Sequence, residues 1–282
     1  MILVTGSTGT VGSEVVKQLQ AAGAQFRVAV SSLTKAKLAN AEGLQAAVLN
    51  YTDPQSFEYA LKGIERLFLL SPPGATEMEA GLIEAARKDD VRHIVKLSVI
   101  GADTGATIFG REHGAMEKKI KESEVAYTFL RPNGFMQNYL TNFGALIKSQ
   151  GQFFLAQGDS KYSVVDVRDI AAVAVKALTQ AGHEGKAYTI TGPEALSNAQ
   201  IAEKLTKAIG KPVKYVAISD EQMRGAMQQQ GAPAAMVDAL IDLMHFYIAG
   251  KAAIVTKDVE KVTKRPATTF DEFAKENAAA FQ

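Results

Sequence analysis

The 282-residue sequence contains no cysteine and no tryptophan, and it lacks an excess of charge of either sign. The absence of cysteine excludes disulfide bonds, thiolate catalysis and zinc–sulfur sites, and is compatible with a cytoplasmic location. The chain has 31 basic and 30 acidic residues, a net charge of +1. Such a chain has no strong field that would attract nucleic acid or an acidic membrane surface, so neither is an expected partner.

Long apolar runs and clusters of metal ligands are lacking as well. No run approaches the ~20 apolar residues of a membrane helix, and a strand expected from residue 2 leaves no room for a signal peptide. The four histidines are scattered and no carboxylates cluster, so we expect no metal site. Hydrophobic residues make up 47% of the chain, enough for one large core and a smaller lobe. These features favour a cytoplasmic enzyme. The sequence does not indicate its oligomeric state.

A glycine-rich segment follows the first apolar run, Met1 to Val4, and opens an amphipathic stretch, Ser13 to Ala22. A strand that runs through glycines into a helix forms a phosphate cradle, because glycines permit the tight turn and the helix end presents unpaired N–H groups. The alternative is a glycine turn with only a packing role. We expect a dinucleotide to bind at Gly6, Ser7, Thr8, Gly9, Thr10, Val11 and Gly12.

Apolar strand-like runs alternate with helix-like segments up to about residue 150. The runs are Ile2–Thr5, Phe26–Val30, Ala46–Leu49, Arg66–Leu70, His93–Leu97 and Tyr127–Leu130. This alternation predicts an α/β fold of Rossmann type, a doubly wound parallel sheet with its ligand at the carboxyl ends of the strands. Those ends carry Gly6, Ser31, Asn50, Ser71 to Gly74, Ser98 and Arg131. We expect Asn50, Ser71 and Pro72 to contact the cofactor.

Shorter units follow residue 150, so we expect an NAD(P)-binding domain over 1–150 and a smaller substrate-binding α/β lobe over 151–282 that shares its core. The pattern predicts a hairpin over Gly151–Val165, a strand over Ala187–Thr191 and a helix that Ser197 caps and that runs to Ile209. Helices are further expected over Asp169–Leu178, Asp220–Gln229 and Ala234–Ala249, the last two as a cap over the strand ends.

Two serines stand where an enzyme that prefers NAD usually has an acidic residue, about 20 residues beyond the glycines. Ser31 and Ser32 can donate hydrogen bonds to the extra phosphate of NADP, and Lys35 and Lys37 follow closely. We therefore expect NADPH to bind more tightly than NADH. Two serines that only cap the next helix are an equally simple interpretation.

Five motifs, in this order, resemble the NmrA-like group of atypical short-chain dehydrogenases/reductases across nearly the whole chain. Within that group the chain most resembles flavin-free NAD(P)H reductases that act on quinones, azo dyes and triphenylmethane dyes. The resemblance implies NADPH as cofactor, with no flavin and no metal, and a small aromatic substrate. The motifs are TGSTGTVG at Thr5–Gly12, VLNYTDPQSF at Val48–Phe57, TFLRPNGFMQN at Thr128–Asn138, VVDVRDIAAVA at Val164–Ala174 and YTITGPEALS at Tyr188–Ser197.

The chain departs from the wider superfamily at the catalytic residues. Extended members carry Tyr-Gly-x-Ser-Lys with a glutamate four residues after the lysine. If Glu117 marks that register, Phe109 stands in the place of the tyrosine and His113 in that of the lysine. A phenyl ring donates no proton, so alcohol oxidation and sugar epimerisation are unlikely activities. The superfamily also includes NmrA itself, a dinucleotide-sensing regulator, which is the alternative function.

Hydride transfer to an intrinsically electrophilic quinone or azo bond needs mainly that the acceptor is held against the nicotinamide. Water or His113 would deliver the proton, and His113 is alternatively a ribose contact or a structural residue. Ser98, at the nicotinamide side, is the other catalytic candidate, and a turn serine is its alternative. Aromatic residues and methionines suit a flat substrate: Phe109, Phe135, Met136, Tyr139, Met223, His245, Phe246 and Tyr247.

Overall fold

The computed structural model describes residues 1–72 and 76–282, and within these the chain divides into two compact units whose segments interleave. Unit 1 comprises Met1–Val99, Glu112–Arg131 and Val167–Tyr188, and unit 2 comprises Ile100–Arg111, Pro132–Asp166 and Thr189–Gln282. The expected boundary at residue 150 does not coincide with this division, because the chain returns to unit 1 after residue 166. The returning segment carries α8 (Val167–Thr179), which packs against α1 (Thr10–Ala21).

Unit 1 is built around a parallel sheet in which seven strands of the described residues follow the order β3-β2-β1-β4-β5-β6-β9. The strand order reverses beside β1, as in a doubly wound Rossmann sheet. The expected fold class is confirmed, and the strand that the sequence placed at Ala187–Thr191 joins this sheet as β9. The strands are β1 (Ile2–Val4), β2 (Phe26–Val30), β3 (Ala46–Val48), β4 (Arg66–Leu69), β5 (His93–Leu97), β6 (Ala126–Pro132) and β9 (Lys186–Ile190).

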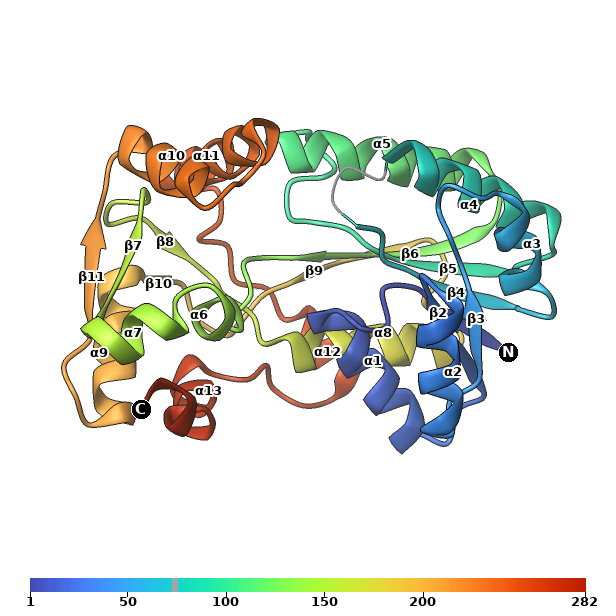
Figure 1. The fold of residues 1–282 in the computed structure, drawn as a ribbon, viewed down its shortest axis with the longest axis horizontal. Coiled ribbons are helices and arrows are strands. Elements are labelled where there is room, and N and C mark those ends of the chain that lie inside the picture. The colour runs from blue at the N-terminus through green and yellow to red at the C-terminus, as the bar shows by residue number, and fades with distance from the viewer. Residues whose placement is uncertain (73–75) are drawn as a thin grey trace. The chain divides into compact units, whose positions relative to one another are not determined.

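Helices cover both faces of this sheet (Figure 1). The face toward α1 and α8 also carries α2 (Leu33–Ala41), and the opposite face carries α3 (Gln55–Leu61), α4 (Thr76–Lys88) and α5 (Ile108–Glu122). Helix α5 begins in unit 2 and continues in unit 1 from Glu112 onward.

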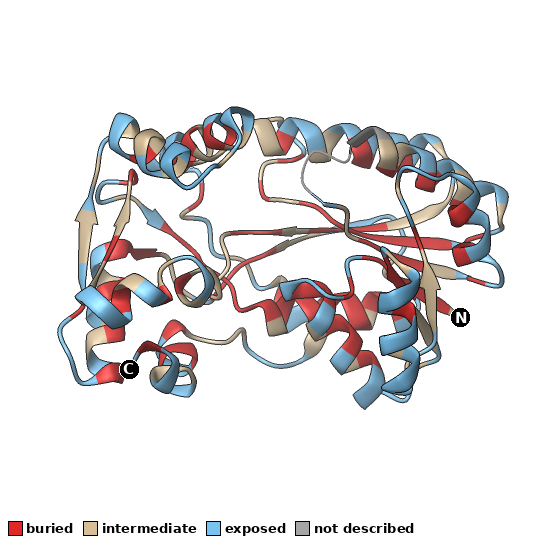
Figure 2. Cartoon of the chain, viewed as in Figure 1, coloured by how far each residue is buried: buried red, intermediate tan, exposed pale blue. Residues whose placement is uncertain are grey.

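Apolar residues form the core between the sheet and α3, α4 and α5. Alternate strand residues such as Leu3, Leu67 and Ile94 point to this face and pack with Leu82 of α4 and Ile120 of α5. The central strands are buried over nearly their whole length (Figure 2). Burial on both faces is typical of a parallel sheet, and it explains why the sequence shows continuous apolar runs.

Unit 2 contains two small sheets in the described residues. Strand β7 (Gln152–Leu155) pairs in parallel with β11 (Lys214–Ala217), and β8 (Lys161–Tyr162) pairs antiparallel with β10 (Leu196–Ser197). The predicted hairpin over Gly151–Val165 is therefore wrong. Across β7 and β11, Phe153 faces Tyr215 with ring centroids 5.5 Å apart, an aromatic pair between distant segments that local patterning does not reveal.

The helices of unit 2 surround an aromatic core. Tyr139 packs against the rings of Phe143, Phe153 and Phe270, with centroids 5.3–5.8 Å apart.

The sequence predicted both ends of α10 as they are observed, and it predicted the ends of α11 to within one residue. The elements are α6 (Asn138–Thr141), α7 (Gly144–Gln150), α9 (Asn198–Ile209), α10 (Asp220–Gln229), α11 (Ala234–Ile248), α12 (Asp258–Thr263), α13 (Phe270–Glu276) and a short 3-10 helix (Ala278–Phe281).

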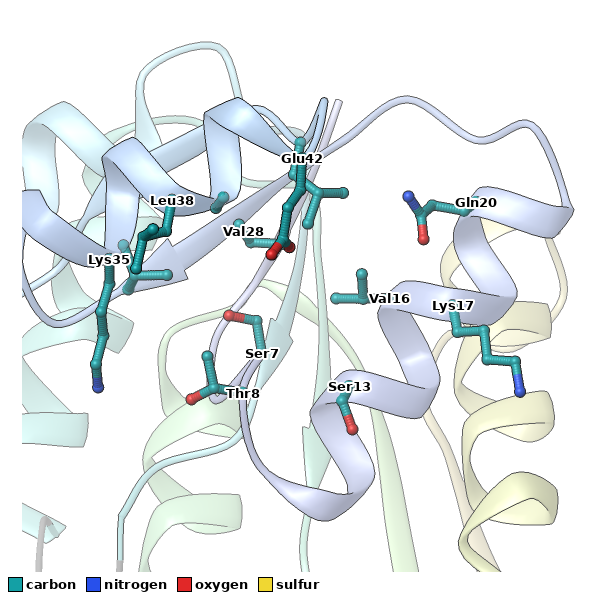
Figure 3. A pocket seen from close by; sticks show the side chains of 13 residues that line it. Ser7, Thr8, Ser13, Val16, Lys17, Gln20, Val28, Lys35, Leu38 and Glu42 are labelled. Carbon is teal, nitrogen blue, oxygen red and sulfur yellow. The ribbon is translucent and has the colours of Figure 1, made fainter.

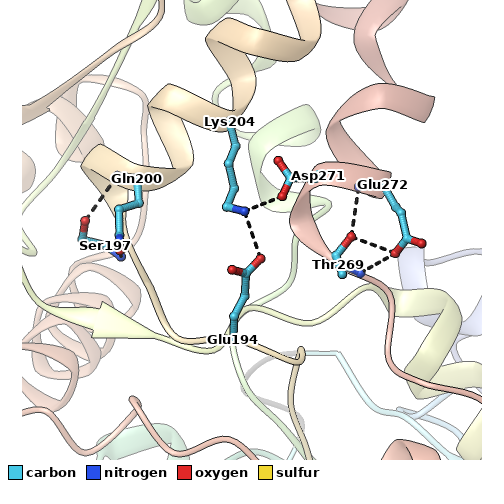
Figure 4. Close-up of polar contacts among 7 residues, drawn as sticks. All are labelled: Glu194, Ser197, Gln200, Lys204, Thr269, Asp271 and Glu272. Atoms are coloured by element: carbon cyan, nitrogen blue, oxygen red, sulfur yellow. Dashed lines mark hydrogen bonds and ion pairs between the residues drawn. The ribbon is translucent and has the colours of Figure 1, made fainter.

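Side chains cap and connect the helices of unit 2 (Figure 4). Ser197 and Gln200 form a reciprocal capping box at α9, as the sequence predicted for Ser197, and Thr269 and Glu272 form another at α13. Lys204 of α9 joins these helices further, because its Nζ lies 3.2 Å from Glu194 and 2.5 Å from Asp271. Within the described residues, the helices include none long and apolar enough to span a bilayer.

Candidate functional site

The carboxyl ends of the parallel strands meet at one edge of the sheet in unit 1. This edge brings together the residues that the sequence selected there, because the register keeps neighbouring strands aligned. They are Gly6, Ser31, Asn50, Ser71, Ser98 and Arg131. Pro73 and Gly74, which the sequence also placed at this edge, lie outside the described residues.

The glycine segment forms a tight loop between β1 and α1. Gly6 has a φ of +62°, and its carbonyl oxygen accepts a hydrogen bond from the Gly9 N–H at 3.0 Å. A Cβ on Gly12 would lie 2.0 Å from that same carbonyl oxygen, whereas a Cβ on Gly9 would lie 3.4 Å from it. Gly12 is thus required by the packing of the loop itself, whereas a Cβ on Gly9 would meet the protein only at van der Waals distance.

The amino end of α1 is left open for an anion. No side chain in the described residues caps this end, and its first turn holds no acidic residue. The helices α2, α9, α10 and α13, by contrast, are capped by Ser32, Ser197, Ser219 and Thr269. Unpaired N–H groups and the helix dipole make the end of α1 suitable for a phosphate.

Not every loop residue presents its side chain to a ligand. Ser7 is buried, and its hydroxyl donates to the Ala29 carbonyl oxygen at 3.0 Å, which ties the loop to β2. Val11 and Gly12 are buried as well, whereas Thr8, Gly9 and Thr10 are exposed. Any contact that Ser7 makes with a phosphate would therefore come from its backbone.

A groove of about 460 Å³ opens between α1 and α2 beside this loop (Figure 3). Its floor is apolar, with Val28 and Val30 of β2, and its rim carries Lys17 and Lys35. Glu42, which ends α2, also lines it and turns its carboxylate into the groove. Glu42 lies outside the sequence window around Ser32 in which an NAD-preferring enzyme usually has an acidic residue, and the C-terminal end of α2 brings it back to the groove.

Three further cofactor candidates take part in local hydrogen bonds. The Ser32 hydroxyl oxygen accepts from the Lys35 N–H at 3.3 Å, so the capping interpretation of this serine holds. The Asn50 side-chain oxygen accepts from both the N–H and the hydroxyl of Thr52. Ser71 lies 3.5 Å from the Tyr51 hydroxyl. Pro72, Ser31 and Lys35 are exposed, so a ligand can reach them directly.

Ser98 belongs to a buried ionic cluster. Its hydroxyl donates to Glu117 Oε1 at 2.6 Å, and Arg131 binds the same carboxylate through Nε at 2.9 Å and Nη2 at 2.6 Å. Ser98 is 5% exposed and Glu117 3%. The Ser98 hydroxyl thus donates its proton to a buried carboxylate, and its catalytic role stays a prediction.

His113 is half-buried on α5, one turn before Glu117. Burial, and to a smaller extent the ammonium of Lys96, lowers the pKa of His113 to about 3. Lys96 is itself buried on β5, 2.9 Å from Glu79 of α4. The lysine within the apolar run His-Ile-Val-Lys-Leu is the sequence signal for this buried charge. A neutral imidazole at neutral pH does not favour the proton-donor role of His113, and both the ribose contact and the structural role stay open.

The expected substrate residues all lie in unit 2, and the structure separates them into two groups. Met136 and Tyr139 are each 1% exposed, and the Tyr139 hydroxyl is 2.5 Å from that of Tyr162 and donates to Asn198. These two are core residues, contrary to the expectation. Phe246 and Tyr247 are buried, with Tyr247 stacked on Tyr162, whereas Phe109 and Phe135 are half-buried.

The other two substrate candidates, Met223 and His245, also lie in unit 2, and each has neighbours there. Met223 is buried in α10, and the exposed His245 lies 2.7 Å from Asp220. Among the described residues no three histidines, aspartates or glutamates gather as metal ligands.

Comparison with known proteins agrees with this geometry. Residues 6–181 match the NAD(P)H-binding family, so the chain belongs to that family. It is 44% identical to the NAD(P)H azoreductase of Xenophilus azovorans over all of this chain and 99% of that protein. It is 32% identical to quinone oxidoreductase 2 of Escherichia coli over 96% of each.

A solved structure shows the same fold with a dinucleotide bound. The NADPH complex of the NADPH-dependent quinone oxidoreductase of Escherichia coli superimposes with a TM-score of 0.88, at 31% identity, over 98% of this chain and 99% of that one. The resemblance inferred from the sequence motifs is confirmed, as is the expectation of an NAD(P)H-dependent oxidoreductase.

The loop geometry predicts opposite effects of two glycine substitutions. Gly9→Val should abolish NADPH binding in a fluorescence titration while the protein remains folded, because its Cβ meets the protein only at van der Waals distance and the branched side chain would occupy the space beside the helix end. Gly12→Ala should lower the melting temperature, since its methyl group collides with the Gly6 carbonyl. Unchanged NADPH affinity in Gly9→Val would contradict the assignment of the loop.

Two histidines whose pKa values are lowered, His93 and His113, predict a loss of stability in acid. Burial lowers the pKa of His93 and of His113, so each binds a proton more readily in the unfolded chain, where its pKa is about 6.5. The free energy of unfolding that the two neutral histidines contribute is complete above a pH of about 6.5. It is lost as the pH falls below that value, and for His113 the loss continues down to a pH of about 3. His113→Gln should weaken the pH dependence of urea unfolding by up to about 2 kcal/mol between pH 7 and pH 5. An unchanged dependence would show that His113 is not held neutral.

Proposed function

We propose that the protein is a flavin-independent reductase that uses NADPH to reduce a flat conjugated aromatic compound, an azo compound or a quinone. The open amino end of α1 beside the glycine loop carries the cofactor assignment. The acceptor class rests on the relatives, since one is named as an azoreductase and another as a quinone oxidoreductase. A cytoplasmic location and the absence of a flavin and a metal remain predictions.

The residues present fit a dinucleotide phosphate. Gly9 leaves the space beside the helix free, α1 offers its N–H groups, and no acidic side chain lies in its first turn. The exposed side chains of Thr8, Thr10 and Lys35 would hold the phosphates from the loop and the groove. The bound cofactor would supply a hydride to the acceptor.

Three side chains, two on α5 and one just after β5, favour an acceptor that needs no acid from the protein. Phe109 has no ionisable group, His113 is neutral because its pKa is lowered to about 3, and the Ser98 proton is held by Glu117. A quinone or an azo bond is electrophilic through its own conjugation, so orientation of the two partners supplies much of the rate enhancement. Water then delivers the proton that completes the reduction.

A turnover assay with NADPH and a quinone or azo dye tests this function. We expect the nicotinamide absorbance to fall in the presence of the acceptor and without added flavin. Binding of NADPH without turnover on any such acceptor would favour the regulatory alternative.

The groove supports NADPH over NADH by a modest factor. Lys35 and Lys17 bring positive charge to its rim, while Glu42 brings a carboxylate that would repel a phosphate. Charges at this exposed surface are screened by solvent and salt, so neither sign dominates strongly.

Ser32→Asp should reverse this preference. Aspartate also caps helices, so α2 is retained, while its charge repels the 2′-phosphate and offers the ribose hydroxyls an acceptor. We expect kcat/KM to fall roughly tenfold for NADPH relative to NADH, equivalent to ~1.4 kcal/mol. Ser32→Asn caps the helix without a charge and serves as the control. A wild-type preference for NADH would contradict the proposal.

His113→Ala should raise the KM for NADPH with little change in kcat. A lost contact between a neutral imidazole and a ribose hydroxyl costs ~1 kcal/mol, or about fivefold in affinity. The pH profile of kcat should keep its shape, since no acid has been removed. Phe109→Leu is the companion variant and should keep most of its activity. A large loss of kcat with an altered pH profile in His113→Ala would restore the proton-donor role.

A further inference from the structure

We infer that Glu117 is a positioning residue for the cofactor: its buried ion pair with Arg131 fixes the face of α5 that presents His113. The inference rests on the proposed ribose contact of His113 and assigns a role to a carboxylate that the hydride transfer itself does not use.

Glu117 joins three elements of unit 1. Its carboxylate binds Arg131 of β6 through two hydrogen bonds and the Ser98 hydroxyl just after β5 through a third. The Ser98 N–H donates to the Leu130 carbonyl oxygen at 2.7 Å, so the two strand ends are also joined directly. Bidentate pairing of arginine with a carboxylate fixes direction as well as distance.

The geometry of α5 transmits this constraint to His113. Residues four apart lie on the same face of a helix, about 6 Å apart along its axis. On the facing strand, Lys96 and Ser98 are two residues apart and so point to the same side of the sheet. Accordingly Lys96 pairs with Glu79 of α4 and Ser98 with Glu117 of α5. The rotation of α5 that Glu117 sets is therefore also the rotation that directs His113, one turn earlier on the same face.

Stability alone does not account for a charged pair in this position. Met116 and Ile120 already pack α5 into the apolar core, on either side of Glu117 in the sequence. A well-packed apolar pair often stabilises a fold as much as a buried ion pair, because burying charge is costly. Apolar contacts, however, allow small rotations and shifts that directional hydrogen bonds do not. The ion pair therefore contributes the orientation of α5.

The experiment is a double-mutant cycle read as the dissociation constant for NADPH in a fluorescence titration. Glu117→Met and Arg131→Met are introduced together, so that neither charge is left unpaired, and the pair is combined with His113→Ala. We expect the methionine pair to keep its melting temperature within a few degrees and to raise the dissociation constant about as much as His113→Ala. In the His113→Ala background it should add no further loss.

Two more variants keep the inference falsifiable. Glu117→Gln retains an acceptor for Ser98 but loses the charge, and it should raise the dissociation constant by a smaller factor. Lys204→Met removes a lysine that bridges Glu194 and Asp271 in unit 2 (Figure 4) and should leave NADPH binding unchanged. If Glu117→Gln proves poorly folded, the methionine pair alone decides.

The outcomes separate this inference from the proposed function. The positioning role would be overturned if the methionine pair lowered NADPH affinity equally in the wild-type and the His113→Ala backgrounds. It would also be overturned if the methionine pair folded and lowered NADPH affinity in neither background. Unchanged binding in His113→Ala would overturn it as well and would remove the ribose contact. None of these results bears on whether the wild-type protein reduces a quinone or an azo dye, which the turnover assay answers separately.

Discussion

The carbonyl oxygen of Gly6 lies where a side chain on residue 12 would begin, and this close approach sets how α1 lies against β1 in unit 1. A Cβ on Gly12 would be 2.0 Å from that oxygen, so only glycine allows α1 to start this near to β1. The helix end is thereby held against the edge of the sheet without a side-chain cap. Because α1 packs against α8, the returning segment of the chain depends on the same approach.

Unit 1 contains two buried ion pairs on one face of the sheet, near the carboxyl ends of β5 and β6. Glu79 with Lys96, and Glu117 with Arg131, place two ion pairs under α4 and α5. Their effect on the site is indirect. Lys96 disfavours protonation of His113, and Glu117 orients the helix that carries it. A reductase whose acceptor is already electrophilic needs such control of position more than it needs an acid.

Much of unit 1 could be predicted because its signals are local. The strands β2 and β5 have the predicted ends, and the glycine loop lies between β1 and α1 as its spacing indicated. The capping residue of α9 and the ends of α10 were read from short motifs in the same way. In unit 2 the prediction failed where pairing joins distant segments. Strand β7 pairs with β11, some 60 residues away, and not with its neighbour β8.

The sequence by itself determined the parallel sheet, the glycine loop and the class of cofactor, since apolar periodicity and glycine spacing act within a few residues. Only the tertiary structure decided which polar side chains are free. It engaged the protons of Ser7 and Ser98 in hydrogen bonds, buried Tyr139 and Met136, and brought Glu42 to the groove. Each of these outcomes depends on a partner or a neighbour distant in the sequence or across a helix. Burial and hydrogen bonding are properties of the packed chain, and residue type and spacing alone do not fix them.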